Sequence, residues 1–392
     1  MVENQATLSD YKETNSIGEV FEGTALCRGI MDLAPSRLES MQVKGENKMK
    51  TAKRAIFNLN KCYAIAKLVY RGEDCFLVAA EKQDPCLLFR ADGTYLEKVW
   101  DGPGGVMTME QIPDSDGVFL ATHKFYSPND AARAKIVVAS PKEAGWQVKT
   151  LCEAPYVHRF GILSRNGVHY LIVCCLKSGH EYKEDWRFPG ATYGAVLPAN
   201  LDEIMEGAPL KLTLLMDGML KNHGFSKYTE ADVQTALVAC DSGVYQFVPP
   251  DSMEGQWEIR KLISDPSSDA VLIDLDGDGE PELGSMTPFH GDTLRIYKKN
   301  SEGAYEPVWE YPEKCEFLHA TWAGELFGKP AWYVGSRKGD RRSMVITYKG
   351  GYRAEIFDNG AGAANAMLLD TDRLVMTNRE VDEIAIYSFS EE

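Results

Sequence analysis

Histidine is the residue type that most clearly suggests a chemical site in this sequence. His158, His223, His290 and His319 recur through the middle of the chain. Imidazole is a common protein ligand of transition metals, and three such ligands leave a coordination position open for a substrate. The sequence therefore predicts a centre for Zn²⁺ or Mn²⁺ held by His158, His223 and His290, with His319 able to replace any one of them.

Other polar residues could supply proton transfer and charge stabilisation beside such a centre. A metal with cationic neighbours suits a substrate rich in oxygens, such as a sugar, from which a base removes a proton while an acid assists the leaving group. Arg or Lys side chains stabilise the negative charge that develops. We assign proton transfer or substrate contact to His180, Tyr182, Lys177 and His123, and the charge clamp to Arg337 and Arg379.

Three aromatic residues accompany these groups. Trp186, Phe225 and Phe289 lie near the same predicted loops and could stack on a pyranose ring. Packing between neighbouring elements is the alternative role for each of them.

The elements that must position these residues are short β-strands in a repeating pattern. Each run is rich in aliphatic and aromatic residues, and Gly, Asp, Asn or Pro occupies the gaps. The first unit is predicted to contain strands at Cys62–Val69, Asp74–Glu81, Cys86–Arg90 and Tyr95–Trp100.

The unit recurs along the rest of the chain. Its period is about 45 to 65 residues, which is typical of a propeller blade of four antiparallel strands. We predict an all-β fold, with one seven-bladed β-propeller over residues 51–392 and an N-terminal extension of unknown structure over residues 1–50. Six or eight blades are the alternatives, whereas a sandwich is disfavoured by so long and regular a repeat. Later units are predicted to begin near Val106, His158, Lys221, Ser267, Cys315 and Ala361.

The final unit contains only three recognisable strands before the chain stops at Glu392. The segment Lys53–Asn58 is strand-like and precedes the first blade. We predict that it supplies the missing outer strand, which would close the ring and leave no exposed sheet edge.

Strand direction predicts which residues share a face of the propeller. The innermost strand of a blade starts on one face, and the second strand, being antiparallel, returns to that face. Six of the seven histidines fall at these two registers, and only His169 falls on the opposite face, where we assign it a structural role. The first register holds His158, His223 and His319, and the second holds His123, His180 and His290.

One acidic loop has a sequence that resembles a known family. The segment Ile273-Asp-Leu-Asp-Gly-Asp-Gly-Glu-Pro-Glu-Leu283 is similar to the FG-GAP or VCBS repeat of integrin-type propellers. The resemblance implies a calcium site made by alternate carboxylates, because hard oxygen ligands around a tight turn suit that ion. A turn stiffened by its own Asp hydrogen bonds is the alternative. The implied ligands are Asp274, Asp276 and Asp278, completed by Glu280 or Glu282.

The predicted architecture and residue types also resemble the propeller lyases of acidic polysaccharides and the propeller domain of aldos-2-ulose dehydratase. This resemblance is at the level of the fold, and it implies metal-assisted β-elimination on a carbohydrate. No cupin-like extension follows the propeller. A small sugar or keto-sugar is the expected partner, because no secretory signal is recognisable at the N-terminus.

Two other functional classes remain open. A non-catalytic FG-GAP-like propeller that binds protein or glycan could use the same basic and aromatic loops. A lactonase-type hydrolase would favour carboxylate and Asn ligands over imidazole. A Ser/His/Asp hydrolase has no support, since no Gly-x-Ser-x-Gly motif is present.

Composition narrows the partners further. Asp and Glu (58) outnumber Lys and Arg (42), giving a net charge of −16, which argues against nucleic acid or an anionic membrane as a partner. The nine cysteines form no CxxC pair and mostly lie in apolar runs, which predicts buried free thiols in a reducing compartment. No apolar run is long enough to span a bilayer. The predicted location is cytoplasmic.

Overall fold

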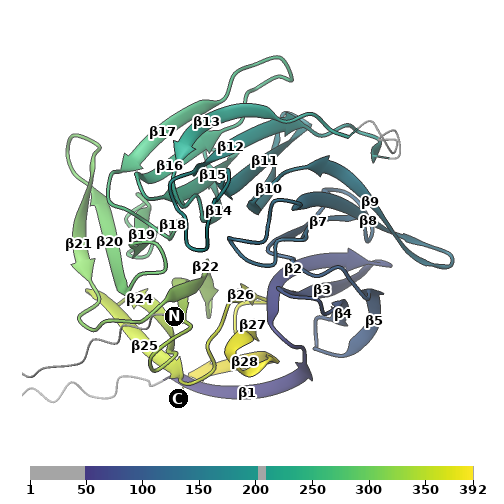
Figure 1. Ribbon diagram of the computed structural model, residues 1–392. Coiled ribbons are helices and arrows are strands. Elements are labelled where there is room, and N and C mark those ends of the chain that lie inside the picture. Colours follow the sequence, from purple (N-terminus) through teal and green to yellow (C-terminus); the bar gives the residue numbers. More distant parts are fainter. Residues whose placement is uncertain (1–48, 202–208, 392) are drawn as a thin grey trace, which may run out of the picture. The chain divides into compact units, whose positions relative to one another are not determined.

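The structure is a computed structural model, and it describes residues 49–201 and 209–391. Its strands form seven four-stranded antiparallel sheets arranged as a ring (Figure 1). The prediction of a seven-bladed all-β propeller is therefore confirmed. The predicted extension over residues 1–50 lies outside the described residues, except for its last two positions, which belong to the first strand.

In the first four blades the strands follow one another in the chain, from the innermost strand outward. Blade 1 contains β2 (Cys62–Tyr70), β3 (Glu73–Ala80), β4 (Cys86–Arg90) and β5 (Tyr95–Trp100). Blade 2 contains β6 (Met109–Gln111), β7 (Phe119–His123), β8 (Lys135–Lys142) and β9 (Gly145–Glu153). Blade 3 contains β10 (Val157–Arg165), β11 (Val168–Lys177), β12 (Pro189–Val196) and β13 (Thr213–Met219). Blade 4 contains β14 (Gly224–Glu230), β15 (Val233–Cys240), β16 (Gly243–Val248) and β17 (Glu258–Ile263).

The last three blades include the one that joins the two ends of the propeller. Blade 5 contains β18 (Asp269–Ile273), β19 (Glu282–Thr287), β20 (Thr293–Lys299) and β21 (Tyr305–Glu310). Blade 6 contains β22 (Leu318–Leu326), β23 (Lys329–Ser336), β24 (Ser343–Tyr348) and β25 (Tyr352–Asp358). Blade 7 contains β26 (Asn365–Leu368), β27 (Arg373–Asn378), β28 (Glu383–Glu391) and β1 (Met49–Asn58), with a short 3-10 turn, Arg379–Val381, before β28.

Blade 7 closes the ring in the way that the sequence predicts. Strand β1 pairs antiparallel with β28, from Met49 opposite Glu391 to Asn58 opposite Glu383. Its half-buried Phe57 also reaches blade 1, where its ring stacks on Tyr95 at 5.4 Å and meets Phe89 edge-on at 5.7 Å. The first strand therefore joins blade 7 to blade 1 by backbone pairing and by aromatic packing.

The core lies between neighbouring blades. In the innermost strand β2, Ala64, Ala66 and Leu68 are buried in this core, whereas Ile65 and Lys67 alternate with them and are more exposed. Such alternation is expected for a strand with one face on a packed neighbour and the other on the propeller axis. All eight cysteines in the described ranges are buried and free of disulfides. None of the helices in these ranges is long and apolar enough to cross a membrane.

We predict that Phe57→Ala lowers the free energy of unfolding by about 2 kcal/mol, because it removes a half-buried aromatic ring that links the first and last blades. Chemical denaturation monitored by tryptophan fluorescence measures this loss. Val308→Ala, on the exposed outer strand β21, is the control and should change stability by less than about 0.5 kcal/mol. Equal effects of the two substitutions would contradict the role of Phe57 in ring closure.

Candidate active site

Seven polar residues occupy equivalent places at or just before the starts of the seven innermost strands. Four of them surround a cavity of about 300 Å³, and the others hold the surrounding backbone or imidazoles. We call this space the histidine cavity. The seven residues are Tyr63, Thr108, His158, His223, Asp269, His319 and Asn365.

Local irregularities in the strands turn some of these side chains inward. In three blades, the pairing of the innermost strand with the second strand slips by one residue. The slips occur at Tyr63, His158 and His319. A β-bulge of this kind redirects a side chain without ending the sheet, and bulges are frequent next to active sites. Three blades therefore use the same backbone device to direct a polar group towards the axis.

The imidazoles of His223 and His319 are oriented by hydrogen bonds on their Nδ1 atoms. His223 Nδ1 lies 3.0 Å from the Asp269 carboxylate and 3.2 Å from the Ser268 carbonyl oxygen. His319 Nδ1 donates to the carbonyl oxygen of Ala364 at 2.7 Å. Because these partners are acceptors, both Nδ1 atoms carry the proton, and each Nε2 atom has a lone pair that can bind a metal or accept a hydrogen bond.

His290 brings a third nitrogen to the same place from the loop after β19. Its Nε2 lies 3.2 Å from Nε2 of His223, and its ring stacks between Phe289 and Phe317, with ring-centre distances of 3.9 and 4.2 Å. Ligand nitrogens of His223, His290 and His319 all lie within 4.8 Å of one another. Nitrogens bound to one tetrahedral Zn²⁺ are separated by about 3.3 Å. The distance between His223 and His290 matches this value, and the three residues together could hold such an ion.

Tyr63 and His158 complete the inner wall of the histidine cavity. The Tyr63 hydroxyl lies 2.9 Å from His319 Nε2 and 3.4 Å from His158 Nε2. His158 also packs against His223, with ring centres 4.4 Å apart. Its Nδ1 is buried without a hydrogen-bond partner. His158 is therefore next to the three candidate ligands but is held less firmly than they are.

Burial sets the protonation of these groups. Burial, together with neighbouring cationic groups, lowers the pKa of His158, His290 and His319 well below the usual value for histidine. The three imidazoles are therefore neutral at physiological pH, which is the form that binds metals. Burial also raises the pKa of Tyr63 to about 12, so its phenol keeps its proton at neutral pH.

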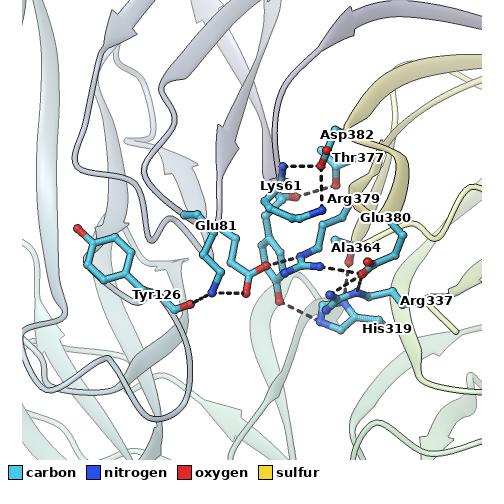
Figure 2. A network of polar contacts seen from close by, with 12 residues as sticks. Lys61, Glu81, Tyr126, His319, Arg337, Ala364, Thr377, Arg379, Glu380 and Asp382 are labelled. Atoms are coloured by element: carbon cyan, nitrogen blue, oxygen red, sulfur yellow. Dashed lines mark hydrogen bonds and ion pairs between the residues drawn. The ribbon is translucent and has the colours of Figure 1, made fainter.

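An ion-pair network lies beside the histidine cavity (Figure 2). Arg337 donates to the Glu380 carboxylate at 2.7 and 2.9 Å, and Arg379 bridges Glu380 to Glu81. Glu81 also pairs with Lys82 at 3.4 Å. Two carboxylates thus hold three cationic side chains in place, and one of these, Arg337, lines the histidine cavity.

A second pocket of about 410 Å³ adjoins the network and shares Phe317 and Arg337 with the histidine cavity. Its wall carries four cationic side chains and the single carboxylate of Glu380. This excess of positive charge suits an anionic group on a ligand. The cationic residues are Arg337, Lys338, Arg341 and Arg379.

The structure brings together only some of the residues assigned from sequence. His158, His223, His290, His319 and Arg337 line the histidine cavity, and Arg379 lines the adjoining pocket. His319, rather than the predicted His158, belongs with His223 and His290 in the tightest group of ligand atoms.

The other assigned residues do not line the histidine cavity. His123 is buried against Trp100, with ring centres 4.8 Å apart. Lys177 is fully buried, donates to the Asp185 carbonyl oxygen and lies 4.6 Å from the Trp186 ring centre.

Two more assigned residues lie in the loop between β11 and β12. His180 Nδ1 lies 3.0 Å from the hydroxyl of Tyr156. Tyr182 is exposed and lies under the Arg187 guanidinium. The two residues share a face with the histidine cavity by strand register but do not line it, although Trp186 of the same loop does.

Of the three aromatic residues singled out in the sequence, two line the histidine cavity and one does not. Trp186 and Phe289 line the histidine cavity and contact each other edge-on at 5.3 Å. Phe225 instead lines a third cavity, which lies farther along the axis.

Sequence reasoning missed Tyr63 and Asp269. Their signal is positional, because each occupies in its own innermost strand the place that histidine takes in blades 3, 4 and 6. Aligning the starts of the seven innermost strands would have revealed both residues.

The acidic loop between β18 and β19 holds a lysine among its carboxylates. Lys298 Nζ lies 2.5 Å from Asp276 and Asp278 and 3.3 Å from the fully buried Glu282. Burial alone would lower the pKa of Lys298, but the hydrogen bonds that it donates to these carboxylates raise the pKa well above its usual value. Asp274 accepts hydrogen bonds from Gly277 and Gly279 in the turn. Calcium binding at this loop remains a prediction. Lys298 would compete with the ion for the carboxylates.

Comparison with solved structures supports the propeller fold. Virginiamycin B lyase from Staphylococcus aureus superposes with a TM-score of 0.56 and 14% identity, covering 87% of this chain and 99% of the lyase. The Dos1 propeller superposes with a TM-score of 0.52 and 9% identity, covering 86% of this chain and 94% of that one. No family model and no curated protein matches the sequence. The chain is thus a seven-bladed β-propeller.

We predict that Lys298→Met destabilises the fold at low calcium, because it leaves buried carboxylates unpaired, and that millimolar Ca²⁺ restores the lost stability. The melting temperature of the wild-type protein should hardly respond to Ca²⁺. Lys299→Met, which removes an exposed pair with Glu280 and a contact with the Tyr305 ring, is the matched control. Stoichiometric Ca²⁺ binding by the wild-type protein, measured by calorimetry, would show that the lysine does not occupy the site.

We also predict an acid-dependent loss of stability that comes from His123. Burial, followed by the nearby Lys135 and Lys124, lowers its pKa to about 4. The folded protein therefore resists protonation that the unfolded chain accepts, so stability is complete above about pH 6.5 and falls as the pH drops towards 4. His123→Phe stays neutral and should reduce this loss by on the order of 2–3 kcal/mol. Identical pH profiles of unfolding free energy for the two proteins would contradict the assignment.

Proposed function

We propose that this propeller is a metal-dependent lyase that eliminates a β-substituent from a small, oxygen-rich, anionic substrate, with a sugar acid or keto-sugar as the expected class. The convergence of three oriented imidazoles in one axial cavity is the observation that carries the proposal. A lyase among the structural neighbours is consistent with this class of reaction, although the likeness itself extends only to the fold.

His223, His290 and His319 are the residues that would hold the ion, with Zn²⁺ or Mn²⁺ as the expected metal. Asp269 and the Ala364 carbonyl fix the tautomers of His223 and His319, and outer hydrogen bonds of this kind strengthen metal binding. A bound ion would supply a Lewis acid for a carbonyl or carboxylate oxygen of the substrate.

Tyr63 and His158 are the residues that we assign to proton transfer. Neutral His158 can accept the proton from the carbon next to the polarised group. The Tyr63 phenol can donate its proton to the departing oxygen, so that a C–H and a C–O bond break and a C=C bond forms. Return of the proton from His158 to Tyr63 across their 3.4 Å contact restores both groups.

Arg337 would orient the anionic group of the substrate. Its side chain is only 12% exposed and its guanidinium is held by Glu380, in the wall that the two pockets share. Trp186 and Phe289 offer apolar surface to the faces of a sugar ring.

Metal analysis tests the binding half of the proposal. Purified, tag-free protein should contain about one equivalent of Zn or Mn. His223→Ala should lose it, and Asp269→Asn should bind it about 10- to 100-fold more weakly. His169→Ala, whose imidazole bonds Ser164 away from the cavity, should retain it. Absence of metal after incubation with Zn²⁺ and Mn²⁺ would refute the proposed lyase and favour a binding propeller.

Kinetics tests the catalytic half. Keto-sugars and uronates should be screened for an unsaturated product by ultraviolet absorbance. With an active substrate, Tyr63→Phe should reduce kcat by at least about 10²-fold while the metal content stays unchanged. Wild-type kcat in the Phe variant would remove Tyr63 from the mechanism.

A further inference from the structure

A third cavity lies farther along the propeller axis, beyond the histidine cavity. Its volume is about 550 Å³. We call it the distal chamber. Apart from Thr108 and Met109, its lining residues lie two to four positions after the seven polar residues at the starts of the innermost strands. Because these strands start at the histidine face, the distal chamber lies towards the opposite face.

The inner wall of the distal chamber is apolar. Ile65, Phe160, Phe225, Val271 and Met367 line it, and they come from five different blades. The Phe225 ring lies across the backbone of Gly161, where a Cβ atom would be only 2.2 Å from the ring. Water in such a space finds few hydrogen-bond partners, so an apolar ligand would displace it favourably.

The outer wall of the chamber carries charge. Lys227 pairs with Glu110 and donates to the Ile162 carbonyl oxygen at 3.3 Å, while Glu110 accepts a hydrogen bond from the Ile162 amide. Lys67 lines the same chamber, is exposed, and makes no hydrogen bond or ion pair within the described residues. The pair of Lys227 and Glu110 is neutral, and Lys67 therefore leaves the chamber with one uncompensated positive charge.

The size of the chamber indicates a ligand site. Packed protein interiors have few voids larger than a water molecule, whereas ligand pockets occupy about 300–1,000 Å³. An apolar wall with one positive charge at its outer end selects a molecule with an apolar body and one negatively charged end.

We propose that the distal chamber binds a small organic monocarboxylate with an apolar body, its hydrocarbon or aromatic part against Phe160 and Phe225 and its carboxylate at Lys67. The ligand is separate from the lyase substrate, since none of the three candidate metal ligands lines this chamber.

Calorimetry with sodium octanoate and 4-phenylbutyrate tests the proposal, with the corresponding alcohols as neutral probes. The wild-type protein should bind at least one of the two carboxylates saturably at one site, and the matching alcohol should bind at least tenfold more weakly. Lys67→Met should weaken carboxylate binding at least tenfold. Lys329→Met, at the start of the second strand of blade 6 and outside the chamber lining, should leave it unchanged.

Two variants that fill the chamber make the test specific. Ala323→Phe and Ile65→Phe place a larger side chain in the wall, and whichever retains the wild-type melting temperature should lose binding. His223→Ala should bind the carboxylate normally, so the outcome is independent of the metal site. No saturable binding to the wild-type protein, or full binding by a folded chamber-filling variant, would overturn the proposal.

Discussion

The pairing of β1 with β28 is the interaction on which the rest of the structure depends. Seven blades surround one axis only if the last blade is completed, and its outer strand comes from the beginning of the propeller sequence. Phe57 extends this closure into blade 1. Without closure, the innermost strands would lack the fixed spacing that lets side chains from separate blades meet at nitrogen–nitrogen distances such as the 3.2 Å between His223 and His290.

Closure creates a layered axis. The first layer is polar and carries the imidazoles, and the following layer is apolar and lines the distal chamber. Burying a polar group costs free energy unless it is hydrogen-bonded, and here Asp269 and the Ala364 carbonyl bond two of the imidazoles. The same bonds give the site its chemical character, because they place the proton on Nδ1 and leave the Nε2 lone pair of each ring available to a metal.

The sequence was sufficient to predict the fold and to bring four of the assigned histidines to one cavity. Strand-like runs at a repeating interval predicted the blades, and Lys53–Asn58 was correctly assigned to ring closure, since these features depend on local patterning. Strand direction also placed the residues of the histidine cavity on one face. Each of these inferences needs only the alternation of side chains and the order of strands.

Finer features could not be read in the same way. The bulges at Tyr63, His158 and His319 depend on one-residue slips in pairing, which hydrophobic patterning does not report. His123 shares the correct face but packs against Trp100, because strand register fixes the face of a residue and not its distance from the axis. Lys298 pairs with the carboxylates of the acidic loop but lies in β20, so the sequence of the loop alone does not reveal it.

X-ray absorption spectroscopy on protein loaded with one equivalent of Zn²⁺ tests the central claim most directly. We predict that the first shell of the zinc includes nitrogen, and that the spectrum shows the multiple scattering of about three imidazoles. That signal should fall in His223→Ala and stay in Lys298→Met. A shell made only of oxygen, or a spectrum of unbound zinc, would contradict the account, because it would place the metal at the acidic loop or nowhere on this propeller.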